Sequence, residues 1–421
     1  MSLFIPLWKN RLFGGPLNNM VKYLNLRPVL KCHWQEKGRK HMDSNETRTA
    51  EGKRLFAFIA IAYGISFLMM IPMYIGKTKG LDLTQIVNAQ MCSPAAGVAI
   101  GYLLFVKGEK RVPKFFMTVL VINYVIQLVL GIASIFFMPF GSAEVIDLAE
   151  LLGSSGTSSD ITGVSTKLPV GQIYNMIGQF ILIDCSILLW IAYFVAGKER
   201  RKFAGLSRNN EGTGILMVLL FVGLYLVRTL APGFVEAAIT KTMPQLLSSY
   251  GDLVHNRLFW LSIVSLPFNY LMTIIAFLGE EYGWRFYLQP IMQKKFGMKI
   301  GIILLGVVWG LWHTPVDLFF YTEDSAPQML IGQIITCVFL GIFFGFVYLK
   351  TNNIWICVCM HFLNNNLIPI ITGTFSADVL TNQHVPWLYL IEILLLDFVI
   401  FGLFIFAKEY KKKKEAVTAD A

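Results

Sequence analysis

The chain has 421 residues, of which 55% are hydrophobic and only 15% charged, whereas an ordinary soluble domain has about 25% charged residues. Its mean hydropathy is +0.58, and apolar runs long enough to cross a bilayer recur along it, which excludes an ordinary soluble protein. The net charge of +10 comes largely from loops between these runs and from the C-terminal tail, where basic residues contact anionic lipid; we expect no nucleic-acid partner.

Residues 1–54 precede the first apolar run and are predicted to form a cytoplasmic N-terminal arm. They are basic, with scattered aromatic residues, and they lack the regions of a signal peptide. A polar stretch from Met42, "MDSNETRTAEGKR", reads as a natural start before the first span. Residues 1–41 are therefore either the product of an upstream start or an amphipathic arm.

Ten apolar segments are each long enough to cross a hydrocarbon core of about 30 Å as a helix rising 1.5 Å per residue. The sequence therefore predicts an all-α, polytopic membrane protein with about ten transmembrane helices and its catalytic core in the C-terminal ones. A flexible loop over 141–172, containing "GSSGTSSDITG", separates an N-terminal group (55–213) from a C-terminal group (214–407), and a basic tail (408–421) follows. The predicted spans are 55–75, 86–106, 116–139, 173–196, 214–231, 259–278, 299–319, 329–349, 353–371 and 386–407.

The distribution of basic residues predicts the orientation of these spans. Lysines and arginines gather after the second, fourth and sixth spans and in the tail, whereas the intervening loops are neutral or acidic. Cytoplasmic loops carry the excess of Lys and Arg, so we expect a multi-pass protein of the cell membrane with both termini in the cytoplasm.

Two adjacent carboxylates and an arginine follow the sixth span in "FLGEEYGWRF". Glu281 and Arg285 are four residues apart and can pair on one helical face, whereas Glu280 points about 100° away. The pair leaves Glu280 free for another task. A bland alternative is that all three side chains are solvated at the cytoplasmic edge of the membrane.

The seventh and ninth spans each carry a histidine within an apolar run. "GVVWGLWHTPVDLFF" places Trp309 and His313 on one face, with Pro315 disturbing the helix; "ICVCMHFLNNNLIPI" places His361 and Asn365 on another. Intramembrane polar residues usually face an interior or a cavity. Each histidine could instead serve structure alone, by bonding to a carbonyl or joining helices.

Other polar residues in or near the spans are assigned lesser roles. Asp317 follows His313 by one turn and could orient it. Asp184, Arg228, Glu392 and Asp397 are expected to pair internally. The six cysteines (Cys32, Cys92, Cys185, Cys337, Cys357 and Cys359) have neither disulfide nor zinc-ribbon spacing, so we interpret them as small apolar residues.

Together, a free carboxylate, two histidines and an amide on three late spans indicate catalysis. A carboxylate near a histidine can activate water, and an imidazole with an amide can hold an oxyanion. The same carboxylate and two histidines are also a possible ligand set for catalytic zinc. Neither HExxH nor G-x-S-x-G is present, which weakens a zincin or a serine hydrolase.

The order E-E-x-x-x-R, aromatic-x-x-x-His, His-x-x-x-Asn resembles the CPBP (Abi) family of intramembrane proteases, which includes the type II CAAX prenyl endopeptidases and bacteriocin-processing relatives. The resemblance covers roughly residues 260–370, and "CSPAAG" with Pro94 looks like the family's second helix. Trp309 departs from the phenylalanine that is frequent in the family, whereas Asn365 fits.

The resemblance implies a membrane-embedded peptidase and a role for each matching residue. Glu280 would activate water with His313 as its partner, and His361 with Asn365 would form the oxyanion side. Glu281 and Arg285 would order the site.

The resemblance to this family decides neither whether the site holds a metal ion nor which peptide is the substrate. A metal-free glutamate mechanism is preferred, with zinc on Glu280, His313 and His361 as the alternative. The substrate would be a leader peptide, a bacteriocin precursor, a membrane-bound regulatory protein or a prenylated C-terminus. A transporter or non-catalytic membrane scaffold is the competing class, because helices broken near polar residues also mark transporter sites.

Overall fold

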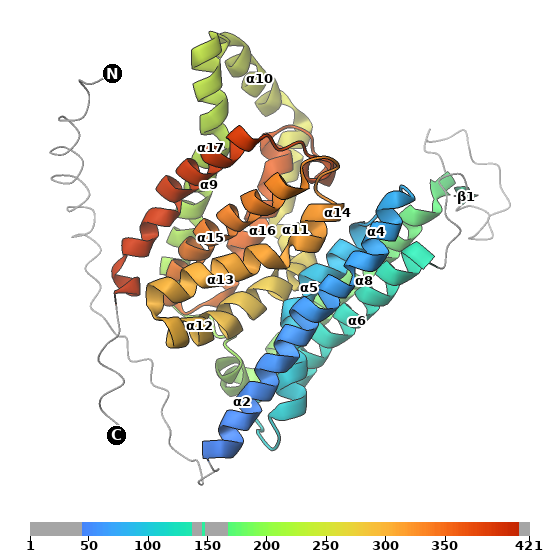
Figure 1. Cartoon of the computed structure of the whole chain (residues 1–421), viewed down its shortest axis with the longest axis vertical. Helices are drawn as coiled ribbons and strands as arrows, with labels where there is room; N and C mark the ends of the chain where they lie inside the picture. Colours follow the sequence, from blue (N-terminus) through green and yellow to red (C-terminus); the bar gives the residue numbers. More distant parts are fainter. Residues whose placement is uncertain (1–43, 137–144, 148–166, 412–421) are drawn as a thin grey trace. The chain divides into compact units, whose positions relative to one another are not determined.

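The apolar segments of the chain fold into helices, because inside a bilayer every backbone amide must be satisfied within the protein. The computed structural model describes residues 44–136, 145–147 and 167–411. All ten predicted spans coincide with helical segments (Figure 1). Of the arm predicted over 1–54, residues 1–43 lie outside the described residues, and residues 44–54 belong to the first helix. Most of the loop over 141–172, Cys32 and the tail from residue 412 also lie outside them.

The first half of the chain contains four long helical segments and a small hairpin. In the first segment a π-helical stretch, η1, interrupts the α-helix, and the fourth, α8, is broken at Gly197. Strands β1 and β2 pair antiparallel, with Val145 opposite Pro169. The elements are α2 (Ser44–Ile59), η1 (Ala60–Ile65), α3 (Ser66–Leu68), α4 (Met70–Thr78), α5 (Thr84–Phe105), α6 (Lys114–Phe136), β1 (Val145–Asp147), β2 (Lys167–Pro169) and α8 (Val170–Phe203).

The second half holds the predicted site and contains two further irregularities. A second π-helical stretch, η2, follows α11, and a break at His313 separates α13 from α14. The elements are α9 (Glu211–Thr240), α10 (Met243–His255), α11 (Arg257–Glu281), η2 (Tyr282–Leu288), α12 (Gln289–Phe296), α13 (Met298–Trp312), α14 (Thr314–Phe319), α15 (Ala326–Thr351), α16 (Ile354–Ile371), η3 (Ala377–Leu380), α17 (Trp387–Ile400), η4 (Gly402–Phe406) and η5 (Lys408–Tyr410).

Eight helical segments in the described part of the chain are long and apolar enough to cross a membrane. The other two predicted spans are α5 and α17. The α5 helix carries Gln85, Asn88 and Gln90 and is buried over most of its length, so it lies inside the bundle. The α17 helix is only 14 residues long. The chain is an all-α polytopic membrane protein.

The sixth span extends further than its apolar pattern predicts. Instead of ending near residue 278, the helix continues through η2 and α12 to Phe296. It continues past the charged residues because Glu280, Glu281 and Arg285 are all buried and have partners inside the bundle. Charged side chains with internal partners do not require the span to end.

The helices that carry the predicted site pack against one another in one large apolar core. The α11 helix packs on α5, α8 and α16, and α13 packs along α15. The described helices from Arg48 onward belong to one compact unit, which contains the whole candidate site. The division of spans at residue 213 and the orientation in the membrane stay predictions.

Candidate active site

The end of α11 and the start of η2 approach α5 so closely that only glycine fits at two positions. A Cβ on Gly279 would lie 2.6 Å from the carbonyl oxygen of Met91, and one on Gly283 would lie 2.3 Å from Cβ of Pro94. The "CSPAAG" segment therefore packs directly against the helix that carries the two glutamates. The π-helix η2 starts right after Glu281, and π-helical turns are frequent at functional sites.

Glu281 is held between two basic side chains in the interior. Arg285 Nε donates to Glu281 Oε2 at 2.8 Å, and His361 Nδ1 lies 2.9 Å from Oε1. Glu281 and Arg285 are both 0% exposed. The predicted pair between them is therefore present, and Glu281 also ties α11 to α16 through His361.

The guanidinium of Arg285 lies over two aromatic rings. Its Cζ is 4.7 Å from the ring centroid of Trp309 and 5.4 Å from that of Phe344. Its Nη1 and Nη2 have no hydrogen-bond partner among the described residues. The rings supply the remaining stabilisation of this cation, because an aromatic face attracts a guanidinium and more strongly where water is excluded.

Glu280 has one engaged carboxylate oxygen and one that receives no bond from a described residue. Trp309 Nε1 donates to its Oε2 at 2.9 Å, and Trp284 Nε1 lies at 3.4 Å. His361 Nε2 is 3.9 Å from Oε1, too far for a direct hydrogen bond. Oε1 is therefore available to accept a proton, while the indole donors fix the carboxylate in place.

His313 lies at the break between α13 and α14. Its Nδ1 is 3.0 Å from the carbonyl oxygen of Trp309 and donates to it, so the proton-free Nε2 can act as an acceptor. Pro315 cannot donate to the carbonyl of Leu311, and the hydroxyl of Thr314 does so instead at 2.6 Å. The predicted disturbance by Pro315 is confirmed.

The structure connects His313 with Glu280 through Trp309. Its backbone carbonyl accepts from His313 while its indole donates to Glu280. No hydrogen bond joins His313 directly to Glu280 among the described residues. The carbonyl of Trp312, next to the break, accepts from Gln90 Nε2 of α5 at 2.9 Å.

Asn365 lies one turn beyond His361 on α16, as predicted, and is half-buried. Its Oδ1 accepts from Nδ2 of Asn364 at 2.9 Å. Its own Nδ2 has no acceptor among the described residues. The NH₂ group of Asn365 is therefore free to donate a hydrogen bond.

The secondary candidates have mixed outcomes. Asp317 does not orient His313: its carboxylate is buried without a hydrogen-bond partner in the described part of the chain. The predicted internal pairing is confirmed for Arg228 and Asp397, whose Nε and Oδ1 are 2.6 Å apart. Asp184 and Glu392 form no ion pair with described residues. The five described cysteines are free, as predicted.

The side chains do not form a complete metal site. Among the described residues, no three His, Cys, Asp or Glu side chains are grouped so that they could hold a metal ion. Glu280 Oε1 and His361 Nε2 are 3.9 Å apart, but His313, whose Nδ1 donates to the carbonyl of Trp309, does not complete a group of three with them. The donor set therefore does not fit a three-ligand catalytic zinc.

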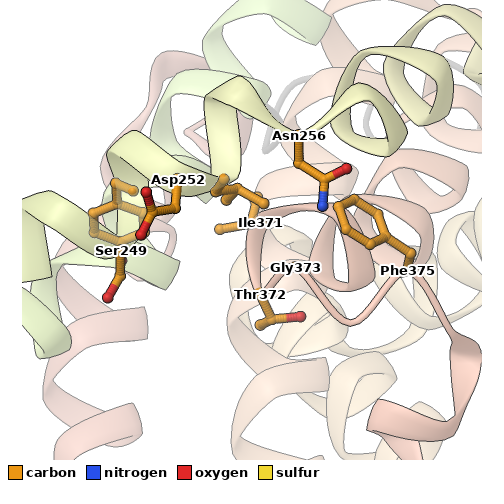
Figure 2. A pocket seen from close by; sticks show the side chains of 9 residues that line it. Ser249, Asp252, Asn256, Ile371, Thr372, Gly373 and Phe375 are labelled. Carbon is orange, nitrogen blue, oxygen red and sulfur yellow. The ribbon is translucent and has the colours of Figure 1, made fainter.

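A separate cavity of about 290 Å³ lies away from these residues, between α10 and the turn that follows α16 (Figure 2). Asn256, Gly373 and Phe375 are among the residues that line it, and no predicted site residue does.

Sequence reasoning missed three contributors to the site. The motif identifies Trp309 as an aromatic residue but does not indicate that its indole N–H donates to Glu280. Trp284 and Gln90 lie outside the motifs. An indole four residues after Glu280 is a readable signal, whereas the contact of Gln90 with Trp312 depends on packing across 222 residues of sequence.

Comparison with known proteins bears on the same helices. Residues 260–367, which contain all six predicted site residues, match the family model described as "Type II CAAX prenyl endopeptidase Rce1-like". Over this segment the chain resembles the type II CAAX prenyl endopeptidases. A curated relative, "CAAX prenyl protease 2" of Methanococcus maripaludis, is 28% identical over 103 residues. The resemblance expected from the motifs is confirmed.

The match is confined to part of each protein. It covers 22% of this chain and 37% of the archaeal relative. No solved structure matches the chain.

Proposed function

We propose that the protein is an intramembrane endopeptidase of the CAAX-protease type, which hydrolyses a peptide bond with water activated by Glu280. The observation that carries this proposal is the asymmetry of Glu280. Its Oε2 is fixed by Trp309 at 2.9 Å, while its Oε1 faces His361 Nε2 at 3.9 Å and receives no bond from a described residue. A buried, oriented carboxylate with one uncommitted oxygen is suited to act as a general base.

In the proposed reaction, Oε1 of Glu280 takes a proton from water, and the resulting hydroxide oxygen bonds to the peptide carbonyl carbon. The proton-free Nε2 of His313 accepts a hydrogen bond from the other O–H of that water. This bond directs the lone pair of the water oxygen toward the peptide carbonyl carbon. Holding the nucleophile in this way removes part of the entropic barrier.

The carbonyl oxygen then becomes an oxyanion. In this step His361 is the imidazolium, with Glu281 at its Nδ1 and Glu280 Oε1 3.9 Å from its Nε2, so Nε2 carries a proton that it donates to the oxyanion. Nδ2 of Asn365 donates as well, because Oδ1 of that amide is already engaged by Asn364. Prepositioned donors of this kind each contribute about 10²–10³ in rate. The C–N bond breaks as Glu280 returns its proton to the leaving amine nitrogen, which restores the carboxylate.

Glu281 and Arg285 keep the site in register without taking part in bond changes. Glu281 accepts from both Arg285 and His361, so it fixes the imidazole plane. The names of the similar proteins support a prenylated C-terminal peptide as substrate. A leader peptide or bacteriocin precursor is the alternative substrate, since it offers the same kind of peptide bond. The proposal places hydrolysis on the cytoplasmic side of the membrane.

The test is cleavage in proteoliposomes of a farnesylated peptide that ends in a CAAX sequence, with an unprenylated bacteriocin leader peptide in parallel. Wild-type protein should cleave at least one, and Glu280→Gln should lose about 10²–10⁴-fold in kcat. Glu392→Gln serves as the matched control, because this glutamate of α17 makes no ion pair with the described residues. Equal rates for wild type and Glu280→Gln would refute the mechanism, and no cleavage of either peptide would favour a transporter or scaffold.

A further inference from the structure

The amide of Asn365 is held in one orientation by its neighbour in sequence. Asn364 Nδ2 donates to Asn365 Oδ1 at 2.9 Å. An amide that already accepts through its oxygen directs its NH₂ elsewhere. The catalytic value of Asn365 therefore depends on a donor that lies beside it and that the EExxxR, aromatic-xxx-His and His-xxx-Asn pattern does not include.

The backbone at this position needs support, because Pro369 lies inside α16. A proline has no N–H for the carbonyl four residues earlier, which is that of Asn365, and its ring crowds the same carbonyl. The helix therefore loses a backbone hydrogen bond at the residue whose side chain must be held accurately.

A tyrosine from another helix reaches this weakened turn. The hydroxyl of Tyr225 on α9 donates to the carbonyl oxygen of Asn364 at 2.8 Å. Tyr225 is 3% exposed and packs on Phe221 with ring centroids 5.8 Å apart. The hydrogen bond thus comes from a buried, fixed side chain.

The α9 helix is itself anchored one turn further on. Arg228 donates through Nε and Nη2 to both oxygens of Asp397 on α17, at 2.6 and 3.1 Å, and Nη2 also lies 3.4 Å from the hydroxyl of Thr336 on α15. Arg228 follows Tyr225 by three residues and so lies on the same helical face. This ion pair, in which Asp397 is fully buried and Arg228 partly buried, fixes the register of α9 against α17.

From these contacts we infer that Asn364 and Tyr225 are positioning residues for Asn365: Asn364 orients its amide so that Nδ2 faces the oxyanion, and Tyr225 holds the turn that carries both asparagines. This inference rests on the proposed peptidase function. Neither residue touches the substrate in this arrangement. Their contribution is to keep the donor side of Asn365 directed at the reacting carbonyl.

The chemistry of the Asn364 side chain allows a test by reversal. In Asn364→Asp the carboxylate can only accept, so it should capture Nδ2 of Asn365 and turn the amide oxygen toward the site. The expected loss is that of one oxyanion donor, about 10²–10³-fold in kcat with KM little changed. In Asn364→Ala the amide is released to either orientation, and only a loss of about twofold to tenfold is expected.

Asn366 offers a matched control on the same helix. Its Nδ2 donates to the carbonyl of Phe362 one turn back, at 2.9 Å, so this side chain makes no hydrogen bond to Asn365. Asn366→Asp gives up that single bond to Phe362 and introduces the same charge two residues from position 364. Its kcat should stay within a few-fold of wild type. Tyr225→Phe removes a single hydroxyl and should lower kcat by about tenfold, the value of one hydrogen bond.

The experiment measures kcat and KM of these variants on whichever peptide the wild type cleaves, with thermal unfolding of each. A loss in Asn364→Asp that exceeds both Asn364→Ala and Asn366→Asp, at similar stability, is the expected result. Wild-type kcat in Asn364→Asp, alongside an inactive Glu280→Gln, would overturn this inference and leave the proposed function standing. An equal loss in Asn364→Asp and Asn366→Asp would also overturn it, because charge alone would then explain the effect. An inactive wild type would overturn both proposals.

Discussion

The buried pair of Glu281 and Arg285 gives a quantitative prediction about stability. Both side chains are 0% exposed, and Arg285 Nε lies 2.8 Å from Glu281 Oε2. Arg285→Met keeps an unbranched apolar stem without the guanidinium and leaves the carboxylate with only His361 as a charged partner. Removing one partner of a buried ion pair costs about 3–5 kcal/mol of folding stability, mainly because the remaining charge is left buried without its counter-charge.

The expected change is large enough to measure in mixed micelles. A cost of 3–5 kcal/mol raises the ratio of unfolded to folded protein by roughly two to three and a half orders of magnitude. We would titrate purified protein with a denaturing detergent and follow tryptophan fluorescence, since Trp284 and Trp309 both donate to Glu280, the neighbour of Glu281 in sequence. Glu281→Gln should cost more than Glu280→Gln, because Glu280 has only indole donors.

An exposed ion pair and a double variant test the role of this buried pair. Arg208 and Glu211 form an ion pair of similar length, 2.7 Å, but with side chains 61% and 49% exposed; Arg208→Met should cost at most about 1 kcal/mol. The double variant Glu281→Gln with Arg285→Met should cost less than the sum of the two single changes. If Arg285→Met were no more destabilising than Arg208→Met, or if the two single costs simply added, the buried pair would not have the assigned role.

Three further predictions concern the site and its place in the membrane. Trp309→Phe removes the 2.9 Å hydrogen bond to Glu280 and should lower kcat about 10- to 100-fold, the value of one hydrogen bond to a charged group. Trp312→Phe is the control: it removes an indole hydrogen bond to the carbonyl of Ala62 and should lower stability while kcat is unchanged. Treatment with the chelator phenanthroline should leave the cleavage rate unchanged, and elemental analysis should find well below one zinc per chain. If wild-type protein held one zinc per chain and His313→Ala lost both the zinc and the activity, the metal-free mechanism would be wrong. In intact cells and a cysteine-free background, an impermeant thiol reagent should label Asp160→Cys but not Ser207→Cys; the opposite pattern would invert the predicted topology.

Several features of the site could be predicted from the sequence because they depend on local spacing. The pairing of Glu281 with Arg285, the shared face of His361 and Asn365, and the helix break near Pro315 all follow from helical periodicity and proline geometry. The match of residues 260–367 to the Rce1-like family model bears out the resemblance that these motifs indicated. The positions of the ten helical segments were likewise predictable, because a bilayer requires long apolar stretches.

The tertiary structure decided which atoms of these residues are engaged. Only packing between α11 and α13 brings the indole of Trp309 to Glu280, and only packing between α11 and α16 brings His361 to Glu281. These contacts join residues that are 29 and 80 positions apart. No periodicity encodes such distances, so the sequence could identify the participants but not the free oxygen of Glu280.

The end of the sixth span also shows what the sequence predicts and what only the tertiary structure decides. A run of charged residues predicted that the span stops near 278, because an unpaired charge is costly in lipid. The helix instead continues, since its charges find partners on α13 and α16. Hydropathy measures the cost of each residue alone, whereas the partners that remove this cost come from other helices, and only the folded arrangement brings them together.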